Sequence, residues 1–68
     1  MSNRLAMPTE DELAEMSYSE LHQGSLLAFY QWQEKKRLGE DTTESEKIFH
    51  AFDDEMSKRL ERFKQYLA

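Results

Sequence analysis

The sequence KKRLGEDTTESE at residues 35–46 decides the fold, because it ends one helix and begins another. Three cations at 35–37 suit the negative end of a helix dipole, and Gly39 can take the left-handed conformation that follows a last turn. Thr43 and Glu46 have the three-residue spacing of a capping box. A connection this short makes its two helices antiparallel neighbours. We therefore predict a helical hairpin, with helices from 18 to about 38 and from 44 to about 67.

Two more capping boxes lie upstream of the hairpin. Thr9 precedes Glu12, and Ser17 precedes Glu20, again with a spacing of three residues. The first pair predicts a short helix from about 10 to 16. The second pair predicts a break at Ser17, and the alternative is one continuous helix from residue 10.

The composition is that of a small helical domain. The chain has 68 residues with no Cys, two Gly and one Pro, and it contains no Val. Helix is therefore favoured over strand, and we predict an all-α fold. A chain this short buries little surface and commonly needs a disulfide, a metal or a partner chain. Residues 1–8 lack periodicity, so we expect a flexible N-terminus followed by a single helical-hairpin domain at 9–68.

Apolar residues recur at helical spacing on both sides of the turn. In the second long helix they are mostly three or four residues apart and share one face. In the first long helix the stripe includes Ser25 and Ala28, whose small side chains allow close approach of the opposing helix. The predicted hairpin core consists of Tyr18, Leu21, Ala28, Phe29, Phe49, Phe52, Met56, Leu60, Phe63 and Leu67.

Several large apolar residues fall outside this core. Leu26, Leu27 and Tyr30 lie on the flank and rear of their helix, where a two-helix hairpin has no interior. The short first helix, through Leu13 and Met16, or a second chain would cover them. The simplest assembly is a two-fold symmetric homodimer that resembles a four-helix bundle. The predicted partner or dimer interface consists of Leu26, Leu27, Tyr30, Trp32, Ile48 and Tyr66.

The charge balance restricts the class of partner. The net charge of −5 argues against binding to nucleic acid or to an anionic membrane surface, and it favours a protein with a neutral or basic patch. No apolar run approaches the roughly 20 residues of a membrane span. The first residues lack the apolar core of an export signal, so we expect a cytoplasmic protein.

The residues that could carry chemistry are better explained as surface positions. His22 and His50 lie on different helices and neither begins a spaced ligand pair. The acidic run at 53–55 precedes cations at the spacing of ordinary helix ion pairs. Gly24 and Gly39 stand apart and form no phosphate loop. We expect a non-enzymatic protein without a metal or a cofactor.

The stretches SYSEL at 17–21 and FDDEM at 52–56, with the small size and the two-helix layout, resemble a known group. They are similar to the small acidic helical proteins with which bacteriophages inactivate host regulators, among them the quorum-sensing anti-activators. The resemblance implies a phage protein that dimerises and binds a transcription regulator. The residues and this resemblance together predict a dimeric inhibitor of a host or partner protein.

Two other functions stay open on the sequence. A helical oligomer could bind a small anionic ligand or nucleotide between subunits, through the cations Lys35, Lys36, Arg37, Arg59 and Arg62. The chain could also be a structural adaptor or an assembly chaperone.

Overall fold

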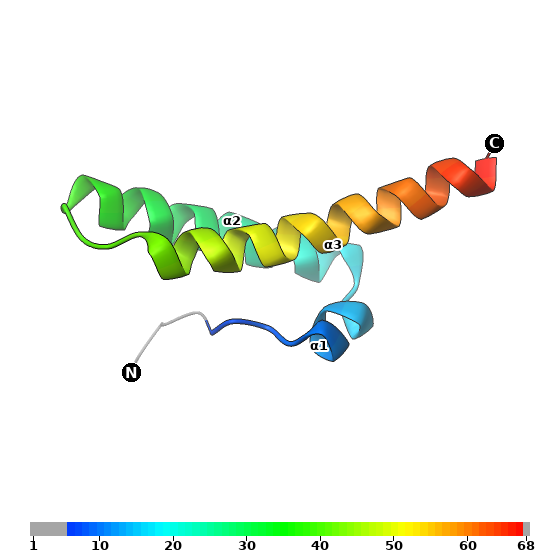
Figure 1. Ribbon diagram of the computed structural model, residues 1–68, viewed down its shortest axis with the longest axis horizontal. Coiled ribbons are helices and arrows are strands. Elements are labelled where there is room, and N and C mark those ends of the chain that lie inside the picture. The colour runs from blue at the N-terminus through cyan, green and yellow to red at the C-terminus, as the bar shows by residue number, and fades with distance from the viewer. Residues whose placement is uncertain (1–5, 68) are drawn as a thin grey trace.

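The computed structural model describes residues 6–67, which form three helices and no strand. Helix α1 spans Glu10–Glu15, α2 spans Tyr18–Arg37 and α3 spans Thr43–Leu67. Helices α2 and α3 pack side by side as an antiparallel hairpin, and α1 lies against α3 (Figure 1). The predicted all-α fold, with a short first helix before a hairpin, is confirmed. The parts of the predicted N-terminus and domain at residues 1–5 and 68 lie outside the described residues.

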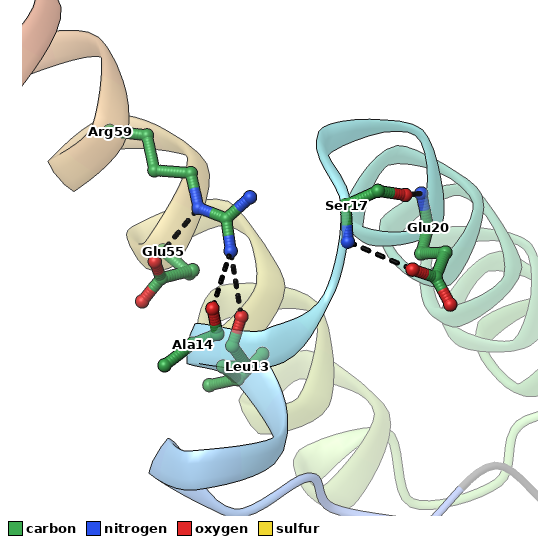
Figure 2. A network of polar contacts seen from close by, with 6 residues as sticks. All are labelled: Leu13, Ala14, Ser17, Glu20, Glu55 and Arg59. Atoms are coloured by element: carbon green, nitrogen blue, oxygen red, sulfur yellow. Dashed lines mark hydrogen bonds and ion pairs between the residues drawn. The ribbon is translucent and has the colours of Figure 1, made fainter.

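Both N-terminal capping boxes form as predicted. The Thr9 hydroxyl accepts from the Glu12 amide at 3.1 Å, and the Glu12 carboxylate accepts from the Thr9 amide at 2.9 Å. Ser17 and Glu20 repeat this exchange at 3.1 and 2.8 Å (Figure 2). The break between α1 and α2 therefore falls at the predicted residue, and no continuous helix runs through it.

The hairpin turn begins with a Schellman motif at the end of α2. Gly39 has a φ of 75°, which a side chain would strain. The Gly39 amide donates to the carbonyl of Lys36 at 3.2 Å, and the Glu40 amide donates to that of Lys35 at 2.8 Å. These two bonds satisfy carbonyls that the helix end leaves open. The predicted stop at Gly39 is confirmed.

The predicted third capping box is wrong. Helix α3 begins at Thr43, one residue earlier than predicted, and the Glu46 amide donates to the carbonyl of Thr42 at 2.9 Å. A carboxylate oxygen of Asp41 accepts from the Thr43 amide at 3.0 Å and from its hydroxyl at 2.7 Å. The Thr42 hydroxyl donates to the Glu46 carboxylate at 2.7 Å. A charged acceptor in the loop has taken the capping role that the sequence pattern assigned to a hydroxyl.

The core lies between α2 and α3 and is closed on one flank by α1. Its buried apolar side chains come from all three helices and are Leu13, Leu21, Ala28, Ile48 and Phe52. Met16, Phe49, Ala51 and Met56 are half-buried against them. Gly24 marks the closest approach, because a Cβ added there would lie 2.6 Å from the ring of Phe52. Ser25 and Ser45 are also buried, which fits a narrow contact between the helices.

The buried face of α3 differs from the predicted one. It lies further around the helix, and it ends earlier along the chain. The buried residues of α3 are Ser45, Ile48, Phe52 and Glu55. Ile48, predicted at an interface between chains, is only 2% exposed and belongs to the core. The pattern of apolar residues missed this face because it counted neither a small Ser nor an ion-paired Glu as core positions.

Five residues predicted in the hairpin core are exposed. On α2, Tyr18 is 60% exposed and Phe29 is 44% exposed. Leu60, Phe63 and Leu67 belong to the C-terminal part of α3, and this end of the helix projects past the start of α2 (Figure 1). Their side chains are 54–67% exposed within the described chain.

Candidate functional site

The outer side of α2 carries a shallow apolar groove. Its lining residues, which we call the α2 groove, are Gln23, Leu26, Leu27, Phe29, Tyr30 and Gln33. The groove has a volume of about 560 Å³, and its lining contains no charged side chain. Leu26, Leu27 and Tyr30 are each about half exposed or more. The structure thus brings three of the predicted interface residues together on one solvent-facing surface.

Trp32, another predicted interface residue, supports this surface from the side. Its ring lies 5.9 Å from that of Phe29 in an edge-on arrangement and 5.9 Å from that of Phe49. Phe29 and Phe49 are 5.8 Å apart, and His50 lies 5.5 Å beyond Phe49. Aromatic contacts of this kind contribute beyond the area they bury. The half-buried Trp32 therefore fixes Phe29, which forms one wall of the α2 groove.

A second exposed apolar surface runs along the end of α3. Its members, which we call the α3 stripe, are Met56, Leu60, Phe63 and Leu67. Tyr66, the remaining predicted interface residue, is 87% exposed but lies off this stripe. Sequence reasoning assigned the stripe to the hairpin core and so missed it as a surface. Counting residues from the turn could have identified this surface. Helix α2 begins 21 residues before Gly39, and Leu60 lies 21 residues after it, so the part of α3 beyond Leu60 has no counterpart in α2.

An arginine of α3 joins that helix to α1. The Nη2 of Arg59 donates to the carbonyl oxygens of Leu13 at 2.9 Å and Ala14 at 3.4 Å, and its Nε donates to the Glu55 carboxylate at 3.0 Å (Figure 2). The Arg59 side chain is three-quarters covered and that of Glu55 almost fully covered. Both helices therefore contribute to one polar contact that holds α1 in place.

A pocket of about 340 Å³ lies next to this contact, between α1 and α3. Its walls carry both signs of charge and consist of Pro8, Glu10, Leu13, Ala51, Asp54, Glu55, Lys58 and Arg62. Carboxylates here oppose the binding of an anion, and the two cations oppose the binding of a metal ion. The pocket offers no preference for one class of charged ligand.

The five cations considered for an anionic ligand do not form one site within the chain. Lys35, Lys36 and Arg37 lie at the turn end of the hairpin, whereas Arg59 and Arg62 lie at its other end. Arg37 contacts the carboxylate of Glu34, with an Nε to Oε2 distance of 3.3 Å, and this contact holds the pKa of Glu34 below its ordinary value. Arg59 is held by the carbonyls of α1. Only a second subunit could bring the two groups of cations together.

Within residues 6–67, no three His, Asp or Glu side chains are grouped as a metal site. None of the helices in this range has the length and apolar character of a membrane span. No protein-family model, curated protein or solved structure matches the chain. The α2 groove and the α3 stripe are the exposed apolar surfaces that the described residues offer to another molecule.

Proposed function

We propose that the chain is a non-enzymatic regulator that acts as a homodimer and binds a partner protein through the α2 groove, altering the activity of that partner. The observation that carries the proposal is the groove itself. Charged residues make up 34% of the chain, yet four large apolar side chains adjoin there without a charge among them. Small proteins rarely leave such a patch exposed unless it binds something.

The shape and composition of the α2 groove favour the apolar face of a helix as its occupant. The groove is open and its lining is apolar, and an amphipathic helix lays its apolar face into a groove of this kind. Gln23 and Gln33 can hydrogen-bond at its ends, and Tyr30 is of a residue type that often dominates binding energy. The net charge of −5 favours a partner with basic residues around its apolar face. The resemblance to phage anti-activators suggests a host transcription regulator as that partner.

Affinity capture with matched baits tests this proposal. Wild-type chain, Leu27→Asp, Tyr30→Asp and the control Gln65→Asp would each be exposed to cytosol of the source cells at physiological salt. Gln65 is exposed on α3, away from the groove, and its variant adds the same charge. We expect one protein that wild type and control retain and both groove variants lose, and that binds the purified chain directly. Equal retention by all four baits, or no specific protein, would contradict the proposal.

Ligand binding and an adaptor role stay predictions from the sequence. Thermal shift of the dimer with nucleotides and cyclic dinucleotides tests the first, because a ligand bound between subunits raises the unfolding temperature. Native mass spectrometry of the chain expressed with its neighbouring genes tests the second.

A further inference from the structure

The two flanks of the helical hairpin are covered unequally. Helix α1 closes one flank, where Leu13 is buried and Arg59 bonds to its carbonyl. The other flank carries the α3 stripe, in which Met56 is half-buried and the remaining three side chains are 54–67% exposed. At 100° per residue, the stripe lies roughly 75° around α3 from the face that packs on α2. It is therefore an open side of the hairpin that no described helix covers.

We infer that the α3 stripe is the surface on which a second copy of the chain binds, with the two α3 helices antiparallel across a two-fold axis. This inference rests on the dimeric state proposed above and assigns the surface that forms it. The α2 groove is then left free on each subunit for the partner protein.

The spacing of the stripe is that of a helix–helix seam. Its residues are separated by 4, 3 and 4 positions, and Phe49 lies seven residues before Met56. This is the a/d repeat by which two helices interlock. The last two turns of α3 have no helical partner within the described chain. Most helical stability in proteins comes from packing of an amphipathic face, so a seam with a second helix would stabilise these turns.

The apolar area agrees with the need of a small homodimer. A Leu or Phe side chain that is about half exposed offers on the order of 100 Å². The stripe with Phe49 therefore offers about 400 Å² of apolar surface on each copy. A standard interface buries about 800 Å² per partner, of which about two thirds, or roughly 530 Å², is apolar in homodimers. The stripe supplies about three quarters of that apolar area.

The charges beside the seam select the antiparallel orientation. When Met56 lies opposite Leu60 of the second copy, Phe49 lies opposite Leu67, and Asp53 lies opposite Phe63 and beside Lys64. The two-fold axis forms each of these pairs twice. A parallel pairing would instead place the two Asp53 carboxylates, which hold a seam position of the repeat, against each other, and like charges repel. Asp53 thus meets a cation in the antiparallel register and a like charge in the parallel one.

Sedimentation velocity with charged variants tests the interface. We expect a dimer for wild type and for Gln65→Glu on the rear of α3, and a monomer for Leu60→Glu and Phe63→Glu. Far-UV circular dichroism should show that these monomers keep the hairpin, because the two side chains are more than half exposed and do not belong to its buried core. A dimer that survives both stripe changes but dissociates on Leu27→Asp would overturn the inference and leave the dimeric state standing. A wild-type monomer at every concentration would overturn both.

Cysteine cross-linking tests the register, since the chain has no Cys of its own. Met56→Cys and Leu60→Cys variants would be oxidised separately and as an equimolar mixture after subunit exchange. The antiparallel register predicts that the mixture forms disulfide-linked dimers several-fold faster than either variant alone. Faster linkage within each single variant would show parallel helices and contradict the inference.

Discussion

At the scale of single residues, Gly24 is the position where the ring of Phe52 fills the space of a missing side chain. A methyl group there would lie 2.6 Å from two ring carbons, and α3 would have to move. We predict that Gly24→Ala destabilises the chain by about 1–3 kcal/mol through overpacking. Helix propensity alone predicts the opposite, a gain of about 1 kcal/mol. Urea unfolding of wild type and Gly24→Ala decides the sign, with the exposed Gln23→Ala as the control that should change little.

Arg59 connects α3 to α1 by hydrogen bonds. Replacing it with Ala removes the donors to two carbonyls of α1 and leaves the mostly buried carboxylate of Glu55 without its ion pair. We predict that Arg59→Ala lowers the free energy of unfolding by about 1.5–3 kcal/mol, as expected for a partly buried charged hydrogen bond. Lys58→Ala, one position away and exposed, is the control. Hydrogen exchange should show that α1 loses protection first, and unchanged exchange in α1 would contradict this role.

Residue-scale features were predictable where the signal was local. The boxes at Thr9 and Ser17 and the stop at Gly39 depend on neighbours within a few residues, so the sequence identifies them. The start of α3 was missed by one residue, because Asp41 accepts from both the amide and the hydroxyl of Thr43, the residue that the sequence pattern assigns as the cap. The bond from Arg59 to Leu13 spans 46 positions along the chain, and no spacing pattern predicts it.

At the scale of elements, the N-termini of the helices depend on ionised carboxylates. The Ser17 amide, and then its hydroxyl, hold the pKa of Glu20 below its ordinary value of 4.5. Thr9 does the same for the pKa of Glu12. Hydrogen bonds from the Thr43 hydroxyl and amide lower the pKa of Asp41 at the start of α3. Each bond is stronger to the charged form of its carboxyl group than to the neutral form.

The chain should therefore lose stability in acid. A carboxyl whose folded pKa is depressed contributes stability above its unfolded pKa, and that contribution is lost as the pH falls through the folded value. We predict that the unfolding temperature falls as the pH drops from above 4.5 through the lowered pKa of Glu20. Glu20→Gln keeps an acceptor at the same place and should fall less steeply over this window. Identical slopes for the two proteins would exclude a contribution from this cap.

The hairpin followed from the sequence, but the faces of its helices did not. A turn at Gly39 between two amphipathic segments permits only an antiparallel pair, so the arrangement of α2 and α3 could be predicted. Which side of α3 meets α2 depends on how closely the backbones approach. Gly24, Ser25 and Ser45 set that distance, and they direct Ile48 and Phe52 rather than Phe49 to the centre.

At the scale of the whole molecule, the described chain has two exposed apolar surfaces, the α2 groove and the α3 stripe. The α2 groove was predictable in part, because Leu26, Leu27 and Tyr30 could not belong to a two-helix seam. The α3 stripe was not predicted, because its spacing is equally that of a core. A periodic stripe shows that a face packs against something, but only the lengths of the helices show whether the chain itself reaches it.

The proposed dimer predicts that the protection of α3 against hydrogen exchange depends on concentration. We predict that backbone amides at 60–67 exchange rapidly in dilute protein and more slowly as the concentration rises through the dissociation constant, since pairing stabilises this segment. Amides in the middle of α2 should change little and serve as the internal control. Hydrogen exchange with mass spectrometry over a dilution series measures both, and exchange at 60–67 that does not vary with dilution would contradict the prediction.

The hold of Arg59 on α1 has a consequence for the N-terminal end of the chain. Helix α1 has six residues and no cation of its own in its last turn, and the positive charge at that end comes from α3. So short a helix does not persist in water without support. Its helical form therefore depends on α3, through the bonds from Arg59 and the burial of Leu13. A change that removed both contacts would unfold α1 and expose Glu55 and the side of α3 that α1 covers.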